Sequence, residues 1–264
     1  MLKTLLLSLL LICFVHIAQA SQQEDTPLPV VLSIDKLQYY IAEPIHISGI
    51  LYNTQDNAIK MLTVGQSISY RKIGHDFVPY TSNANLSRGF MSVFPTEFKP
   101  NEKISLDETL LYNTHTNQYV LDEPGIYEFQ VIMTITLVDG NSKYYTSKTQ
   151  RVTVSEPPNK DKLALKTLKK YQIGYFLNGL DSQSLSSFEW IEEPAKKAAL
   201  FVKKYKESFY TPLVSRKLKA NLNQVKRELE LTKQANGEVL PPELEDIYNR
   251  VKAMIETEAT EDEQ

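Results

Sequence analysis

The chain has 264 residues, of which 42% are hydrophobic and 23% are charged, and its formal net charge at pH 7 is −3. This length suffices for two ordinary domains, and the weakly acidic balance gives no indication of a nucleic-acid partner. The only cysteine, Cys13, lies close to the start of the chain, which excludes a disulfide scaffold and thiol catalysis in the rest of the protein.

Residues 1–20 are typical of a secretory signal peptide. Lys3 is followed by an apolar run from Leu5 to Ile17 and by the small-residue cleavage motif "AQA" at Ala18–Ala20. A membrane anchor is the competing interpretation, but this run falls short of the roughly 20 apolar residues that span a bilayer. We therefore expect a mature chain that begins near Ser21, has no transmembrane segment, and is secreted or periplasmic.

Residues 28–156 carry short runs of β-branched, aromatic and aliphatic residues, separated by Asn, Asp, Gly and Pro. Such runs predict an antiparallel β-sandwich of roughly seven to nine strands. The alternation is clearest in "GIYEFQVIMTITL", where every second residue from Tyr127 to Leu137 is apolar, which predicts a face directed at the core. "VDGNSKYYTS" then predicts a hairpin with Asp-Gly-Asn as its turn.

The composition changes at "SEPPNKDK", Ser155–Lys162, where two prolines precede a lysine-rich half. Beyond this boundary the apolar residues recur with a period of about 3.6, which predicts helices over residues 160–257 and, after them, an acidic disordered tail over 258–264. One helix is expected to begin with Thr211 as its cap and Pro212 in its first turn, and to end before Gly237. Four stripes predict antiparallel helical hairpins: Leu168, Tyr171 and Tyr175; Ala198, Phe201, Val202 and Tyr205; Val214, Leu218, Leu222, Val225 and Leu229; Leu244, Ile247, Val251 and Met254.

Two stretches of the first half, "YYIAEPIHISGILYNTQDNAIKMLTVGQSISY" at Tyr39–Tyr70 and the later "DEPGIYEFQVIMT", resemble immunoglobulin-like domains of bacterial secreted proteins. The order is also similar to the proteinase-inhibitor sandwich of bacilli and to the β-domain of deuterolysin-type proteases. The resemblance implies an immunoglobulin-like sandwich and, as an alternative function, proteinase inhibition through loops such as Gly74–Phe90. The chain departs from both families, because it has no tryptophan before residue 190 and no His-Glu-x-x-His.

One stretch of the second half, "AALFVKKYKESFYTPLVSRKL" at Ala198–Leu218, resembles a joint of tetratricopeptide-like helical repeats. One joint does not make a repeat protein, because stable arrays usually need at least three repeats. The predicted fold class is therefore α+β with segregated domains, an N-terminal antiparallel immunoglobulin-like β-sandwich followed by a C-terminal all-α helical-hairpin domain.

The sequence offers no convincing catalytic, cofactor-binding or metal-binding residues. Three histidines follow the signal segment, His46, His75 and His115, and none has a second ligand at metal-binding spacing. Glu192 and Glu193 precede Pro194, so we expect them in the first turn of a helix, where their charge complements the helix dipole. We therefore expect a non-enzymatic binding protein without a cofactor.

Charge and tyrosine content indicate where a partner would bind. Residues 160–230 carry 15 Lys and Arg against 8 Asp and Glu, whereas residues 231–264 carry 3 against 9. Such charges usually coat a solvated helix face, but they also suit an acidic partner, either a protein or an envelope component. The candidate partner-binding residues are Lys196, Lys197, Lys203, Lys204 and Lys206. Several of the fifteen tyrosines could instead line one end of the sandwich, although tyrosine suits strands generally.

Overall fold

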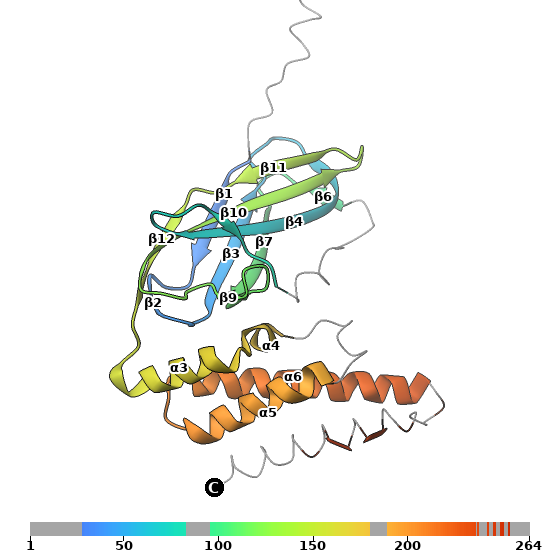
Figure 1. Ribbon diagram of the computed structural model, residues 1–264. Coiled ribbons are helices and arrows are strands. Elements are labelled where there is room, and N and C mark those ends of the chain that lie inside the picture. Colours follow the sequence, from blue (N-terminus) through green and yellow to red (C-terminus); the bar gives the residue numbers. More distant parts are fainter. Residues whose placement is uncertain are drawn as a thin grey trace, which may run out of the picture.

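The computed structural model describes residues 28–82, 96–179 and 189–235, with seven further positions up to 253. In these ranges a β-rich part is followed by helices (Figure 1). The predicted signal peptide at 1–20, the second part of the Gly74–Phe90 loop, the fourth helical stripe and the acidic tail at 258–264 lie outside the described residues.

The strands form two main sheets and one small ribbon. The first sheet has the order β1-β3-β7, and the second has the order β2-β12-β10-β4-β5 with β11 on β10 and β6 on β4. The strands are β1 (Val30–Ile34), β2 (Gln38–Tyr40), β3 (Ile45–Tyr52), β4 (Ile59–Lys72), β5 (Val78–Pro79), β6 (Thr96–Phe98), β7 (Lys103–Leu110), β8 (Tyr112–Asn113), β9 (Gln118–Tyr119), β10 (Gly125–Leu137), β11 (Ser142–Thr146) and β12 (Gln150–Ser155).

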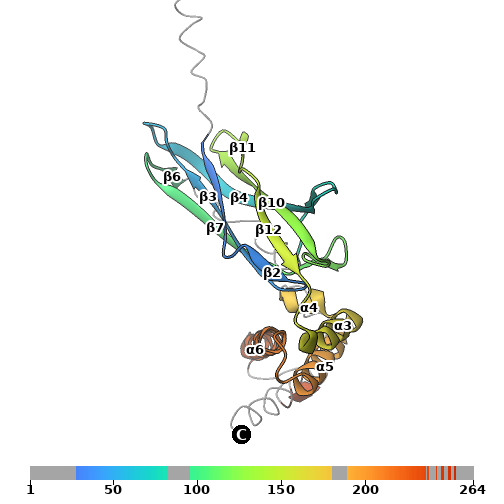
Figure 2. The same cartoon turned by 90° about the vertical axis from the view of Figure 1, so that its left-hand side faces the viewer.

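The two main sheets lie as two layers, which Figure 2 shows nearly edge-on. They approach closely at Gly49 of β3, where an added Cβ would lie 2.8 Å from Val131 and 3.1 Å from Met133 of β10. The predicted apolar face of β10 is confirmed, since Tyr127, Phe129, Val131, Met133 and Ile135 are all at most 2% exposed. The core of the β-rich part therefore lies between the layers.

The predicted hairpin after β10 is also confirmed. Gly140 takes a positive φ of 85° in the turn, which glycine adopts without steric cost. The returning chain pairs with β10 twice, first as β11 and then as β12. Ser147 interrupts the return, where its backbone N–H donates to the carbonyl of Val131.

The helical part comprises η1 (Asn159–Asp161), α3 (Lys162–Tyr171), α4 (Gly174–Asn178), α5 (Glu189–Lys204) and α6 (Thr211–Ala235). The predicted stripe of α6 is confirmed, because Val214, Leu218, Leu222, Val225 and Leu229 are all buried. The prediction that Leu168, Tyr171 and Tyr175 share one helix is wrong. Gln172 takes a left-handed φ of 53°, which ends α3, and the chain starts again as α4.

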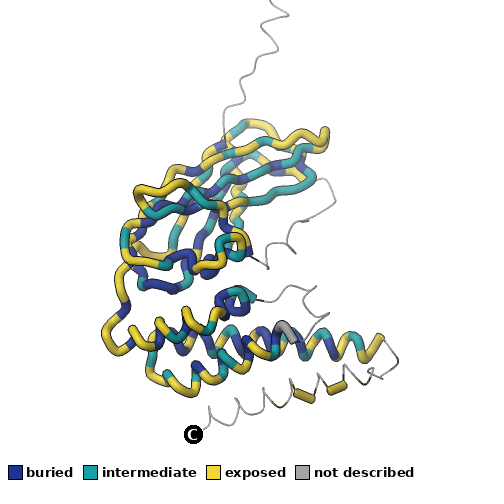
Figure 3. The backbone as a smooth tube through the Cα atoms, viewed as in Figure 1, coloured by how far each residue is buried: buried dark blue, intermediate teal, exposed yellow. Residues whose placement is uncertain are grey.

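The helices pack against the end of the β-rich part that carries Tyr112 and Tyr119. Tyr112 and Tyr119 are buried there with their rings edge to face, 5.3 Å between centroids. An added Cβ on Gly174 of α4 would lie 2.0 Å from the Tyr112 ring. Figure 3 shows buried residues on both sides of this junction. Two of the tyrosines that were a candidate binding surface, Tyr112 and Tyr119, are therefore buried at the junction with the helices, whereas Tyr144 is 69% exposed.

Three side chains of the helical part form hydrogen bonds across the junction. The Tyr210 hydroxyl donates to the carbonyl of Ile41 at 2.7 Å. The Asn178 side chain accepts from the backbone N–H of Tyr112 at 3.0 Å and donates to the carbonyl of the same residue at 2.5 Å. In the last turn of α3, Lys169 donates to the carbonyl of Asp122 at 2.6 Å. These contacts set the orientation of the helices and hence of the lysines that they carry.

Candidate functional site

The five predicted lysines lie on α5 and just beyond its end, and they do not form one uniform charged cluster. Lys196 pairs with Glu192 at 2.8 Å, and Lys197 pairs with Glu193 at 3.5 Å, both one helical turn apart. The hydrogen bond from Lys196 keeps the pKa of Glu192 below its usual range. The positive charge of these two lysines is therefore partly compensated within α5.

Glu192 and Glu193 are not first-turn residues as predicted. Helix α5 already includes Glu189, and Pro194 lies inside it. The ion pairs with Lys196 and Lys197 account for the two carboxylates better than a helix dipole does, because the dipole acts mainly within the first turn. Glu192 also lies 3.5 Å from Arg250, which brings that later residue close to α5.

The other three predicted lysines occur at the end of α5 and after it. Lys203 and Lys204 are exposed in the last turn, and the ammonium of Lys204 lies 5.4 Å from the centre of the Tyr205 ring. Lys206 is exposed after the helix has ended. Glu192 and Glu193 of α5 pair with Lys196 and Lys197 and not with Lys203 or Lys204.

A second lysine stripe lies on α3, which the sequence analysis did not single out. Helix α3 buries Ala164, Leu165 and Leu168 and contains no acidic residue. Its remaining face carries exposed lysines, namely Lys162, Lys166, Lys169 and Lys170. Within the described residues, no carboxylate lies within ion-pairing distance of them. The signal was present in "KLALKTLKKY", where the lysines alternate with a helical apolar stripe.

The two lysine stripes lie on neighbouring helices. α3 packs against α5, and the hydroxyls of Thr167 and Tyr205 join the helices at 2.6 Å. We define the basic surface as Lys162, Lys166, Lys169 and Lys170 of α3 with Lys203 and Lys204 of α5. Compared with the predicted set, it gains four lysines of α3, while Lys196, Lys197 and Lys206 lie outside it.

The described residues contain no group of three or more His, Cys, Asp or Glu side chains that could hold a metal ion. All three histidines after the signal segment are exposed. The ring of His46 pairs through Nδ1 with the Thr109 hydroxyl at 2.8 Å, while Asp35 accepts from the backbone N–H of His46. Because Asp35 binds the backbone and not the ring, it does not orient the imidazole as a catalytic triad requires.

The loop considered for proteinase inhibition is described only as far as residue 82. Its first part includes β5, whose Val78 pairs with Tyr70 of β4. Arg71 lies 4.4 Å from the centre of the Phe77 ring. This part of the loop is thus bound to the edge of the larger sheet.

Comparisons with known proteins give a likeness for part of the chain only. No family model matches it, and no curated protein matches it. Among solved structures, it is similar to the sporulation control protein Spo0M from Bacillus subtilis, at 16% identity over 55% of this chain and 55% of that one, with a TM-score of 0.31. The chain thus spans about half the length of Spo0M.

Two further structures show similar levels of likeness. A CARDB domain from Pyrococcus furiosus is 11% identical over 49% of this chain and 94% of that one, with a TM-score of 0.28. The C-terminal domain of wzt is 8% identical over 49% of this chain and 72% of that one, with a TM-score of 0.34. These similarities identify no ligand and no activity for this chain. Within its described part, no helix is both long enough and apolar enough to cross a bilayer.

Proposed function

We propose that this chain is an exported, non-enzymatic binding protein, in which an immunoglobulin-like sandwich holds a helical-hairpin domain whose basic surface binds an acidic partner. The partner is a protein or an anionic component of the cell envelope. The signal-like segment at residues 1–20 supports export, with no membrane-spanning segment left after cleavage.

One observation carries this proposal. The lysines of α3 are exposed along one stripe of a helix that has no acidic residue, and no carboxylate of the described residues pairs with them. Charges of alternating sign along a helix face indicate a solvent-exposed face with salt bridges, as on α5. A stripe of lysines without ion pairs to described residues concentrates positive potential, which steers an acidic partner and raises its association rate.

The test reverses three lysines of the basic surface, Lys166, Lys170 and Lys203, to Glu in the mature chain. The matched control reverses three exposed lysines of the β-rich part, Lys60, Lys103 and Lys148, so both variants undergo the same change in net charge. Binding is measured by cosedimentation with vesicles containing anionic phosphatidylglycerol and by capture of proteins from an envelope extract.

We expect the first variant to lose at least about tenfold in one of these assays at low salt, and the control to lose much less. The difference should shrink at physiological ionic strength, where the screening length is roughly 8 Å. Equal losses of binding by the two variants would mean that only net charge matters. Unchanged binding by the first variant would mean that the lysines only coat a solvated helix face. Inhibition of a secreted protease by the unaltered mature chain would favour the inhibitor alternative instead.

A further inference from the structure

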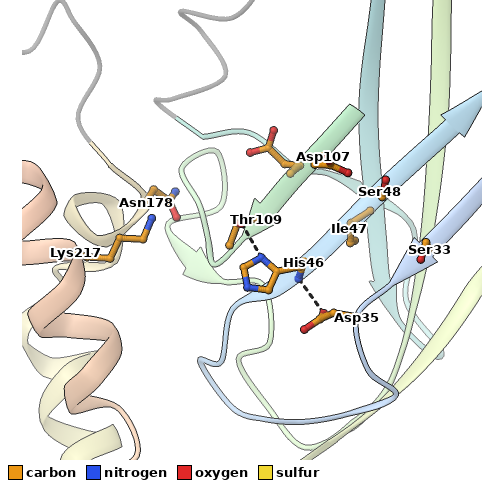
Figure 4. Close-up of a pocket in the computed structure, with 10 residues that line it drawn as sticks. Ser33, Asp35, His46, Ile47, Ser48, Asp107, Thr109, Asn178 and Lys217 are labelled. Atoms are coloured by element: carbon orange, nitrogen blue, oxygen red, sulfur yellow. Dashed lines mark hydrogen bonds between the residues drawn. The ribbon is translucent and has the colours of Figure 1, made fainter. Parts of the chain in front are cut away.

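A polar cleft of about 400 Å³ lies where the β1-β3-β7 sheet meets the helices (Figure 4). One wall is formed by side chains of the sheet, including His46, Ser48, Asp107 and Thr109, and the other by Asn178 and Lys217. The cleft thus exists only while both parts of the chain are docked together. Its size falls in the range of roughly 300–1,000 Å³ that is typical of small-molecule sites.

The sheet wall follows from the register of two neighbouring strands. His46 of β3 lies opposite Thr109 of β7, and Ser48 lies opposite Asp107. Because side chains two residues apart share one face of a sheet, all four point away from the core between the sheets. Among the described residues, Asp107 accepts one long hydrogen bond, from Ser105 at 3.5 Å, so its carboxylate retains capacity for a ligand.

Asp35, which also lines the cleft, differs from Asp107 in this respect. One of its oxygens already accepts from the Tyr39 hydroxyl at 2.5 Å and from the backbone N–H of His46 at 3.0 Å. The carboxylate of Asp35 therefore holds the strand ends together. Asp107 is the better candidate for contact with a bound cation.

The helical wall carries the opposite charge. Lys217 of α6 is half-buried and points towards the sheet wall in Figure 4. Burial and the neighbouring Arg216 lower the pKa of its ammonium group, and the charge of Glu108, which also lines the cleft, opposes them. Because burial and Arg216 outweigh Glu108, a ligand carboxylate in contact with Lys217 would favour the charged form of the lysine. Within the described residues Lys217 forms no ion pair within 4 Å, and Asn178 is held rigidly by the backbone of Tyr112.

We propose that this cleft binds a small zwitterion, of which a free α-amino acid is the simplest, with its carboxylate at Lys217 and its ammonium group at Asp107. Facing walls of opposite charge complement the two ends of such a molecule. A sugar fits less well, because the described lining residues include no Phe, Tyr or Trp ring for stacking. Ile47 is the only apolar residue among them, so recognition is polar.

The experiment uses the mature full chain and isothermal titration with each free L-amino acid in turn. The tightest binder is then compared with its N-acetyl derivative, which lacks the ammonium group, and with its amide, which lacks the carboxylate. We expect either modification to weaken binding at least about tenfold, because each removes one charge-assisted contact.

Two substitutions then assign each end of the ligand. Lys217→Met should abolish the preference for the free acid over the amide, and keep the preference for the free amine over the N-acetyl form. Asp107→Asn should do the reverse. The matched controls, Lys219→Met on the same helix and Asp56→Asn far along the chain, change exposed residues and should alter neither preference.

Circular dichroism and the unfolding temperature of each variant show whether it has folded, and Lys217→Gln provides a more polar replacement should Lys217→Met fail to fold. The proposal is overturned if no free amino acid binds at millimolar concentration, or if the modified ligands bind as well as the free one. It is also overturned if the two cleft variants change the preferences no more than their controls do.

Discussion

The two faces of the helical part differ in how far their polar groups are already used. On the face against the sheets, Tyr210 donates to Ile41 and Asn178 bonds the backbone of Tyr112. On α3, by contrast, exposed lysines lie along a stripe that no described carboxylate pairs. Surplus tyrosine and surplus lysine both suggested a binding surface, and the comparison teaches that the tyrosines are mostly used inside the molecule.

The difference implies a division of roles that can be tested on each face separately. Substitutions at the junction should change the stability of the protein, because they disturb buried packing and satisfied hydrogen bonds. Substitutions of the basic-surface lysines other than Lys169, which donates to the carbonyl of Asp122 at the junction, should leave stability nearly unchanged. The comparison would be wrong if junction substitutions left stability unchanged, or if substitutions on the basic surface lowered it strongly.

The largest effect is expected from Gly174→Ala at the junction. The new Cβ would lie 2.0 Å from Cδ2 and 2.5 Å from Cε2 of Tyr112, and the Tyr112 ring is itself packed against Tyr119. Overpacking of this kind costs about 1–3 kcal/mol. Urea unfolding should show a lower midpoint, and trypsin should cut faster near Lys160 and Lys162 as the helices loosen.

Gly65→Ala is the matched control for this prediction. Gly65 lies in β4, and no atom lies within 4 Å of where its Cβ would be. Replacing a flexible glycine without a clash stabilises by about 0.4–1 kcal/mol. Helix propensity alone would make Gly174→Ala stabilising as well, so two stabilising substitutions would show that the junction is not tightly packed.

The spacing of apolar residues predicted the strands and helices in which that spacing alone decides which side chains are buried. The alternation of β10 and the stripe of α6 each identify a buried face, because one side of the element meets a continuous apolar layer. Glu128 shows the limit of the same rule. It lies on the face of β10 opposite to the predicted apolar one but is only 3% exposed, because Arg71 and Arg151 on the flanking strands bind its carboxylate from both sides.

The junction could not be predicted in this way. The contact of Gly174 with Tyr112, and the break at Gln172 that makes it possible, depend on how two distant segments meet. The spacing of apolar residues within either segment does not indicate that the two segments come into contact. The candidate lysines were predicted from their density on α5, but density does not reveal that Glu192 and Glu193 lie one turn from Lys196 and Lys197, or that α3 lies alongside.

A smaller effect is expected from Tyr210→Phe, which removes one hydroxyl and keeps the ring. The buried carbonyl of Ile41 would lose its donor, at a cost of about 1–2 kcal/mol in the free energy of unfolding. Tyr144→Phe is the control, because the Tyr144 side chain is 69% exposed and should change stability little. Equal effects of the two substitutions on stability would show that this hydrogen bond does not stabilise the junction.

The Tyr210 contribution should also depend on pH. Burial, together with the charges of Asp161 and Glu43, raises the pKa of Tyr210. The folded protein then keeps the proton while the unfolded chain loses it above about pH 10, so ionisation favours unfolding. The difference in the free energy of unfolding between the unaltered protein and Tyr210→Phe should therefore be largest below that pH and become smaller above it. Urea unfolding between pH 7 and 11 measures this difference.

The smallest effect is expected on the other face, from the double substitution of Lys166 and Lys170 by Gln. Both lysines are exposed, and like charges one turn apart on a helix repel slightly, so the free energy of unfolding should stay within about 0.5 kcal/mol of the original. Lys196→Gln provides the contrast, since it breaks the pair with Glu192 and should cost a few tenths of a kcal/mol. A large loss of stability from the double variant would mean that the α3 lysines hold the helices in place, and the basic surface would then be a structural feature of the fold and not a surface left open for a partner.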